Sequence, residues 1–347
     1  MPRTPVLIAA ILLCTAGHVS AQWLLQSSGT ETEFRGISPT SDSVVWAAGR
    51  NGIYARTIDG GATWRADTVP GATSLFFVDV HAVDDSTAYL LGTSFDGGLA
   101  KIYKTRDGGA HWIESYSSNV AGVFFDGMAF WYMDRGVAFS DPVEGSFLII
   151  TTADGGATWE TVLPENIPPP LHGEAGFAAS GTAIAVGANG RVWIGTGGGG
   201  VARVLMSEDW GRSWTVSATP LPAGESSGIF GIAFRDSQTG VAVGGDYRAP
   251  TDSSLNILQT QDGGRTWTLV SRSEPQGVRY GVTYVRAGDM WLLVAVGPSG
   301  WGYSADDGVT WDYIDSLGYN TAGAAPGGPV WAAGQDGRIA KFRPSAR

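Results

Sequence analysis

The stretch Asp59-Gly60-Gly61-Ala62-Thr63-Trp64 decides the fold, because the chain repeats it five more times. The later copies end at Trp112, Trp159, Trp214, Trp267 and Trp311, so that successive tryptophans are 44 to 55 residues apart. Repeats of this length are typical of β-propeller blades, each a small sheet packed against its neighbours. Between the copies lie β-rich runs such as Val44-Val45-Trp46-Ala47-Ala48, separated by glycine turns, with no sustained helical period. The pattern predicts about four short strands per repeat and an all-β fold.

The two ends of the chain predict seven blades rather than six. Residues 330–337, Val-Trp-Ala-Ala-Gly-Gln-Asp-Gly, nearly duplicate residues 45–52, so a seventh repeat begins after the sixth tryptophan. That repeat stops at Lys341-Phe342-Arg343, without an outer strand. The segment Gln22-Trp23-Leu24-Leu25-Gln26 resembles the residues immediately downstream of each repeated tryptophan. We therefore predict that the N-terminal strand completes the last blade and closes the ring, which protects the sheet edges.

The repeated residues have a local explanation. An aspartate can accept backbone N–H bonds in a tight hairpin, glycine tolerates a positive φ, and tryptophan packs between sheets. Residues repeated around a rim do not converge on one substrate, so we predict structural rather than catalytic roles for them. In the last copy, Asp306-Asp307-Gly308-Val309-Thr310-Trp311, we assign the structural role to Asp307. The predicted structural set is Asp59, Trp64, Asp107, Trp112, Asp154, Trp159, Asp209, Trp214, Asp262, Trp267, Asp307 and Trp311.

The first 21 residues have the pattern of a secretory signal. A basic start at Arg3 precedes an apolar run from Val6 to Leu13, and Val19-Ser20-Ala21 offers small residues for cleavage before Gln22. We expect a secreted or periplasmic protein with a single domain over residues 22–347, no transmembrane segment and a monomeric state. Cleavage would also remove Cys14, the only cysteine of the chain.

Charge and composition limit the classes of partner and ligand that the chain is expected to bind. The chain holds 22 Lys+Arg against 33 Asp+Glu, a formal charge of −11. Loss of Arg3 with the leader would make it −12. Such acidity argues against nucleic acid as the partner. The histidines have no metal-ligand spacing, and Gly195 to Gly200, which fits a dinucleotide pattern, precedes a β-like run rather than a helix. We expect neither metal nor cofactor.

Candidate functional residues lie where the predicted inner strands begin and where the second strand of a blade turns into the third. Both places meet on one face around the central funnel, whereas the repeated aspartates lie on the other. We expect inner strands to open at places such as Phe34-Arg35, Phe125-Asp126 and residues 173–177. The polar residues there differ from blade to blade, so they can line one asymmetric pocket, or else satisfy strand ends and neighbouring charges. They are Arg35, Asp126, Asp141, Glu174, Asp246, Tyr247, Arg279 and Tyr280.

The repeats resemble the Asp-box motif, Ser/Thr-x-Asp-x-Gly-x-Thr-Trp, also called the bacterial neuraminidase repeat. Thr57, Thr105, Thr152, Ser207, Thr260 and Ser304 stand at its first position. At whole-chain level, Phe34 to Trp64 is similar to the repeat of the photosystem II stability/assembly factor family and its bacterial relatives. That resemblance implies a seven-bladed propeller without catalytic activity that binds a protein partner during assembly. Photosynthetic members use an arginine-rich patch, which this acidic sequence lacks.

The alternative is glycan chemistry, because Asp-boxes also occur in sialidases and in xyloglucan-cleaving enzymes. Phe34-Arg35-Gly36-Ile37 is similar to the sialidase start but lacks its proline. In that case Asp126 and Glu174 would act as acid and base, provided that they lie about 5–9.5 Å apart. We therefore predict a binding propeller that takes a protein or glycan partner on its funnel face, with a glycoside hydrolase as the alternative.

Overall fold

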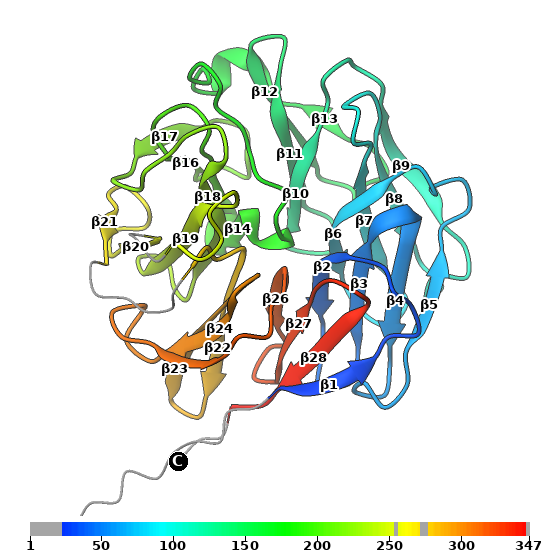
Figure 1. Cartoon of the computed structure of the whole chain (residues 1–347). Helices are drawn as coiled ribbons and strands as arrows, with labels where there is room; N and C mark the ends of the chain where they lie inside the picture. The colour runs from blue at the N-terminus through cyan, green and yellow to red at the C-terminus, as the bar shows by residue number, and fades with distance from the viewer. Residues whose placement is uncertain (1–22, 253–255, 271–276, 345–347) are drawn as a thin grey trace, which may run out of the picture.

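The structure is a computed structural model, and it describes residues 23–252, 256–270 and 277–344. The predicted leader, residues 1–21, lies outside these ranges. Within the described residues the strands form seven four-stranded antiparallel sheets. Figure 1 shows these sheets arranged in a ring, with the first strand of each blade toward the centre. The prediction of an all-β seven-bladed propeller is confirmed.

The first three blades follow the chain in order. Blade 1 contains β2 (Phe34–Pro39), β3 (Val45–Gly49), β4 (Ile53–Thr57) and β5 (Arg65–Thr68). Blade 2 contains β6 (Phe76–Ala82), β7 (Ala88–Thr93), β8 (Ala100–Thr105) and β9 (Ile113–Ser118). Blade 3 contains β10 (Phe125–Phe130), β11 (Gly136–Val143), β12 (Ser146–Thr152) and β13 (Glu160–Thr161).

The remaining blades complete the ring. Blade 4 contains β14 (Ile184–Gly187), β15 (Arg191–Gly195), β16 (Arg203–Ser207) and β17 (Thr215–Ala218). Blade 5 contains β18 (Ser227–Phe234), β19 (Gly240–Asp246), β20 (Ile257–Thr260) and β21 (Thr268–Leu269). Blade 6 contains β22 (Gly281–Ala287), β23 (Met290–Gly297), β24 (Gly300–Ser304) and β25 (Asp312–Asp315). Blade 7 contains β26 (Thr321–Ala324), β27 (Val330–Ala333), β28 (Arg338–Phe342) and β1 (Leu24–Ser27).

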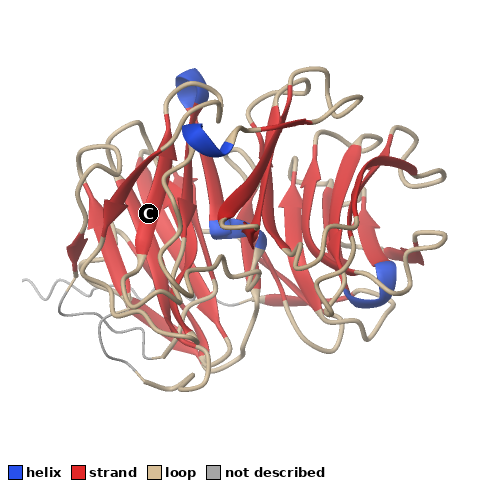
Figure 2. Cartoon of the chain, turned by 90° about the horizontal axis from the view of Figure 1, so that it is seen from above, coloured by secondary structure: helices blue, strands red, loops and turns tan. Residues whose placement is uncertain are grey.

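Helical structure is limited to single turns in the described part of the chain. These 3-10 turns are η1 (Arg50–Gly52), η2 (Pro164–Asn166), η3 (Gly181–Ala183) and η4 (Ala188–Gly190). Figure 2 shows them as short segments among strands that run across the thickness of the molecule. No helix in the described ranges is both long and apolar enough to cross a bilayer.

The N-terminal strand closes the ring as predicted. Strand β1 pairs antiparallel with β28, and Gln26 lies opposite Ile339. Figure 1 shows this as the blue β1 lying beside the red β28. Trp23 is 5% exposed, and its ring centroid lies 4.8 Å from that of Trp301 and 5.8 Å from that of Phe342. The first and last segments of the chain therefore share one apolar cluster, which burial stabilises.

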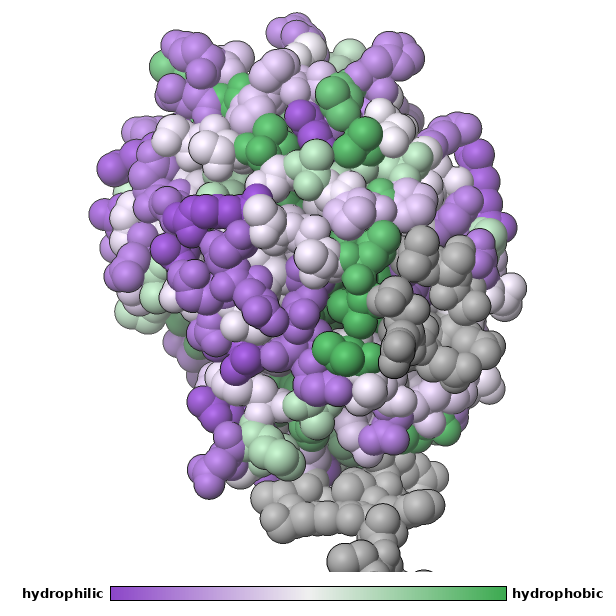
Figure 3. Space-filling model, turned by 90° about the vertical axis from the view of Figure 1, so that its left-hand side faces the viewer, coloured by the Kyte–Doolittle hydropathy of each residue, from purple (hydrophilic) through white to green (hydrophobic). Residues whose placement is uncertain are grey.

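Packing between blades explains the burial pattern. Strand β3 is buried along its whole length, because a neighbouring sheet covers each of its faces. The outermost strands β5 and β13 are mostly exposed. Figure 3 shows part of the outer edge, where polar residues are interspersed with separate apolar patches, as expected for strands packed on one side only.

Blade 4 departs from the sequence prediction. We expected an inner strand to open at residues 173–177, but the inner strand β14 begins at Ile184. Residues 173–177 belong to a long loop that leads to this strand, and Ala175 forms only an isolated bridge with Gly197. In this loop the Glu174 N–H donates to Leu171 O, which favours a turn there instead of a strand.

Candidate functional site

A pocket of about 430 Å³ opens on the face where the inner strands begin. Its walls come from the inner strands of several blades, from the loops that follow the second strands, and from the long loop before β14. Its lining residues are Arg35, Arg50, Phe76, Phe95, Phe124, Asp126, Asp141, Gly176, Phe177, Ala178, Ala179, Phe230, Tyr247 and Tyr280. We call this the funnel pocket.

The structure brings five of the eight predicted funnel residues to this pocket. They are Arg35, Asp126, Asp141, Tyr247 and Tyr280. They share one face of the ring, because strand order in a blade fixes which loops lie on the same side.

One side of the pocket is cationic and is organised by Glu33. Its carboxylate lies 2.6 Å from the Arg35 guanidinium and 2.5 Å from that of Arg50. Burial opposes ionisation of Glu33, but the charges of Arg35 and Arg50 and their hydrogen bonds outweigh it and lower its pKa. Arg35 also donates to Ala179 O at 3.0 Å, which leaves Arg50, at 40% exposure, as the more accessible cation.

The Arg50 guanidinium lies beside a stacked pair of rings. It is 4.7 Å from the centroid of Phe76 and 4.6 Å from that of Phe95, and these rings stack at 5.1 Å. Such cation–π contacts help to hold the guanidinium in place, and its Nε–H donates to Glu33. Phe95 is 61% exposed, an unusual position for a phenylalanine that is not part of a binding surface.

The wall next to the cations is aromatic, and its Tyr280 ring centroid lies 5.7 Å from the Arg35 guanidinium. Phe177 meets Phe230 edge to face at 4.6 Å, and Phe230 meets Tyr280 in the same way at 5.6 Å. Tyr247 stands at the rim of this cluster and is 42% exposed. Rings that are fixed by one another present an apolar surface at a low entropy cost.

Two carboxyl groups, Asp126 and Asp141, lie together at the floor. Burial raises the pKa of Asp126 well above its ordinary value, and the neighbouring charge of Asp141 adds to the effect. Burial raises the pKa of Asp141 to about 6, although its Oδ1 accepts the Gly176 N–H at 2.7 Å. A Cβ at Gly176 would lie 2.5 Å from the Asp126 carboxyl, so glycine permits this close approach.

Glu174 is not a funnel residue, which corrects the sequence prediction. Its side chain is fully buried, and it pairs with Arg203, whose Nε lies 2.8 Å from Glu174 Oε1. The same carboxylate accepts the Thr196 hydroxyl at 2.6 Å and the Leu171 N–H at 2.8 Å. These bonds fasten the long loop to blade 4. The proposed acid–base pair of Asp126 and Glu174 therefore lacks an accessible second carboxylate.

Arg279 and Asp246 also lie outside the funnel pocket. Arg279 is fully buried and donates to Gly300 O at 2.9 Å, and burial lowers its pKa to about 10. Asp246 accepts the Arg248 N–H at 2.9 Å and so stabilises the turn after β19. Both positions were predicted from their place near strand ends, where polar side chains also serve the backbone.

Sequence reasoning missed Arg50 and most of the aromatic lining. Arg50 directly follows β3 on the funnel face, Phe76 and Phe230 stand near the openings of β6 and β18, and Phe177 lies in the long loop before β14. The rule that found Tyr247 would have found them, but it was applied only to polar residues at selected positions.

The repeated aspartates lie on the opposite face and bind their own hairpins. Asp59 Oδ1 accepts the Thr63 N–H at 2.9 Å, and Oδ2 accepts the Thr63 hydroxyl at 2.6 Å. The Thr57 hydroxyl donates to Asp59 and accepts the Gly61 N–H. These hydrogen bonds, chiefly those from Thr63, lower the pKa of Asp59 to about 2.

The last repeat requires a correction. Asp306, not Asp307, accepts the Thr310 N–H and hydroxyl, at 2.8 and 2.7 Å. Asp307 instead pairs with Arg235 at 2.9 Å and accepts the Tyr284 hydroxyl at 3.0 Å, which links blade 5 to blade 6. Counting from Ser304 places Asp306 in the motif, whereas counting back from the glycine suggests Asp307.

Comparisons with known proteins support the fold. No protein-family model and no curated protein sequence matches the chain. Among solved structures, YCF48 bound to a D1 peptide aligns with a TM-score of 0.64 and 15% identity, over 92% of this chain and 94% of that one. YCF48 from Cyanidioschyzon merolae aligns at 0.66 and 19%, over 93% and 99%. The Niastella koreensis GH74 enzyme aligns at 0.60 and 15%, over 91% of this chain but 53% of the enzyme.

Proposed function

We propose that the protein is an exported, non-catalytic binding propeller that captures a peptide segment of a protein partner in the funnel pocket. Export is supported by the signal-like residues 1–21. The peptide ligand is supported by the likeness to YCF48, whose solved structure contains a D1 peptide. The observation that carries the proposal is the lining of the funnel pocket, where exposed aromatic rings and a ring-stacked guanidinium face one space.

This lining suits an extended chain better than a small metabolite. Phe95 and Tyr247 stand exposed at the rim, where they can pack against apolar or aromatic side chains. Arg50 can donate bidentately to a carboxylate or to backbone carbonyls through its two Nη groups, because its hydrogen bond to Glu33 is made through Nε. The ligand that fits is a peptide with an aromatic residue close to an acidic group.

The proposal is tested by screening a peptide array against the full mature chain and measuring the best binder by fluorescence anisotropy. We expect Tyr247→Ala and Arg50→Gln each to weaken binding about tenfold or more. Tyr313→Ala is a matched control, because Tyr313 is 41% exposed but lies on the outermost strand of blade 6. It should bind within about twofold of the parent.

Equal affinity in all three variants would contradict the proposal, as would a screen without binders. A parallel glycan array separates the alternative partner. Tight glycan binding that depends on Tyr247, without peptide binding, would replace the peptide by a glycan ligand.

A further inference from the structure

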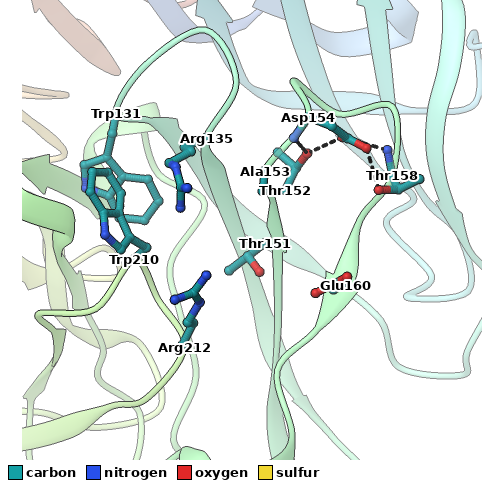
Figure 4. Close-up of a pocket in the computed structure, with 10 residues that line it drawn as sticks. All are labelled: Trp131, Arg135, Thr151, Thr152, Ala153, Asp154, Thr158, Glu160, Trp210 and Arg212. Atoms are coloured by element: carbon teal, nitrogen blue, oxygen red, sulfur yellow. Dashed lines mark hydrogen bonds between the residues drawn. The ribbon is translucent and has the colours of Figure 1, made fainter.

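A second pocket lies on the face that carries the Asp-boxes, between blades 3 and 4 (Figure 4). Its volume is about 170 Å³, smaller than a typical site for a drug-sized ligand. The residues that matter here are Trp131, Arg135, Thr151, Glu160, Trp210 and Arg212. We call it the rim pocket.

Trp210 departs from the repeat at a position where the backbone conformation is unfavourable for a large side chain. At its position the other boxes have Gly60, Gly108, Gly155 and Gly263, with φ between 68° and 77°, or Asp307. Trp210 takes φ 69°, a region that large side chains rarely adopt. Strain of this kind persists where the surroundings enforce it, and it is concentrated at functional sites.

The Trp210 indole is fixed from several sides. Gly190 packs so closely against it that a Cβ there would lie 2.7 Å from the ring. Trp131 meets it edge to face at 5.5 Å, and Trp131 itself donates to Arg191 O at 2.6 Å. The Arg135 guanidinium lies 4.9 Å from the Trp210 ring centroid. The strained residue thus positions a cation.

The two guanidinium groups of the rim pocket keep their N–H donors available to a ligand. Within the described ranges, neither Arg135 nor Arg212 forms an ion pair or a hydrogen bond through its guanidinium. Figure 4 shows the two groups pointing toward the same space, with Thr151 lying between them and Glu160 and its hydroxyl on the Glu160 side. Two like charges that face one space repel each other, and an anion bound between them would remove that repulsion.

The far wall of the rim pocket adds a second requirement for the chemistry of the ligand. Glu160 lies across the pocket from the guanidiniums in Figure 4 and pairs with neither of them. Asp154 is committed to its own hairpin, since it accepts the Thr158 N–H at 2.9 Å and the Thr158 hydroxyl at 2.6 Å. A carboxylate such as that of Glu160 repels a bare anion but accepts hydrogen bonds from hydroxyl groups. The ligand must therefore carry both an oxyanion and hydroxyl donors.

We propose that the rim pocket binds one acidic sugar residue of the hexuronate class. Arg135 and Arg212 take the sugar carboxylate, and Thr151 and Glu160 take ring hydroxyls. The small volume accommodates a single sugar unit. This site is separate from the proposed peptide site, because it lies on the opposite face and shares none of its residues.

The test is a calorimetric or NMR titration of the full mature chain with D-glucuronate, D-glucose and acetate. Glucuronate should bind about tenfold or more tightly than either glucose or acetate, because each of those has only half of the required groups. Arg135→Gln and Arg212→Gln should each weaken glucuronate binding about tenfold. Arg286→Gln is the matched control, because Arg286 stacks 4.1 Å over Trp291 outside the rim pocket, and it should bind like the parent.

If the arginine variants fail to fold, Trp210→Gly provides a second test of the proposal. It restores the glycine of the other boxes and removes the ring under Arg135, so the chain should fold with an unchanged far-UV spectrum while glucuronate binding falls. The proposal is overturned if glucuronate binds no better than acetate, if it does not bind, or if the arginine variants bind like the parent.

Discussion

The aspartates of the two faces behave in opposite ways. On the box face, Asp107 and Asp154 accept backbone and side-chain hydrogen bonds within their own hairpins, which lower the pKa of each to about 2. Toward the funnel and the central channel, burial raises the pKa of Asp79 to about 8 and that of Asp141 to about 6. Aspartate is thus an ionised hydrogen-bond acceptor within a hairpin on one face, and a buried carboxyl group with a raised pKa on the other.

The comparison separates repeated residues from singular ones. A repeated aspartate has equivalent partners in every blade that carries a box, so its contribution is to the hairpin that contains it. A singular residue such as Asp126 has surroundings that no other blade reproduces among the described residues. Function is therefore to be sought where the blades differ, and the strained Trp210 shows that a departure can also lie inside a box.

The largest effect should come from a buried box tryptophan. Trp267 is 6% exposed, and its Nε1 donates to Gly264 O at 3.1 Å. Trp267→Ala should lower the free energy of unfolding by about 3–5 kcal/mol, because it leaves a cavity between blades. Urea denaturation measures this loss. The half-buried Trp64 is the control, since Trp64→Ala should cost clearly less; equal losses would contradict the packing role.

The next largest loss of unfolding free energy is expected at Glu174, where it comes from a buried charge left unpaired. Glu174→Ala leaves Arg203 buried without its partner, which should cost about 3 kcal/mol. Tyr247→Ala, at the exposed rim, should change the unfolding free energy by less than about 0.5 kcal/mol. Denaturation of both variants sharpens the contrast between a structural and a binding residue. A Glu174→Ala protein as stable as the parent would restore Glu174 to the list of binding candidates.

The last prediction concerns pH. The pKa of Asp79 is raised on folding, so its contribution to stability is present below about pH 4 and is lost as the pH rises toward 8. The box aspartates have lowered pKa values, so their contribution is present above about pH 4 and is lost as the pH falls toward 2. The stability of Asp79→Asn relative to the parent should therefore rise steadily from pH 4 to pH 8, because only the parent has a buried carboxyl group that ionises in this range.

Denaturation of variant and parent at several pH values measures this difference. Comparing the two proteins cancels the contribution of His81, whose pKa is lowered to about 4 by burial and which titrates in the same range. Asp59→Asn is the control, because its difference from the parent should change only below about pH 4. An Asp79→Asn difference that is flat from pH 4 to pH 8 would contradict the buried-acid interpretation.

The sequence predicted the features that local, repeated patterns determine. The hairpin chemistry of residues 57–64 recurs with a nearly constant period, which gives the blade count, and the match between residues 45–52 and 330–337 gives the closure. The prediction failed where contacts between residues far apart in the sequence determine the place of a side chain. Glu174 was misplaced because its partner Arg203 lies across a long loop. Arg50 was missed because the rings that hold its guanidinium, Phe76 and Phe95, belong to another blade. No local spacing encodes either arrangement.

The central claim is that the funnel face binds the partner while the Asp-box hairpins hold the blades. Hydrogen exchange with mass spectrometry, on the full chain with and without the best-binding peptide, tests it most directly. Slower exchange should be confined to the segments around Arg50, Phe95 and Tyr247, with hairpins such as residues 57–64 unchanged. Protection of those hairpins, with the funnel segments unaffected, would contradict the claim.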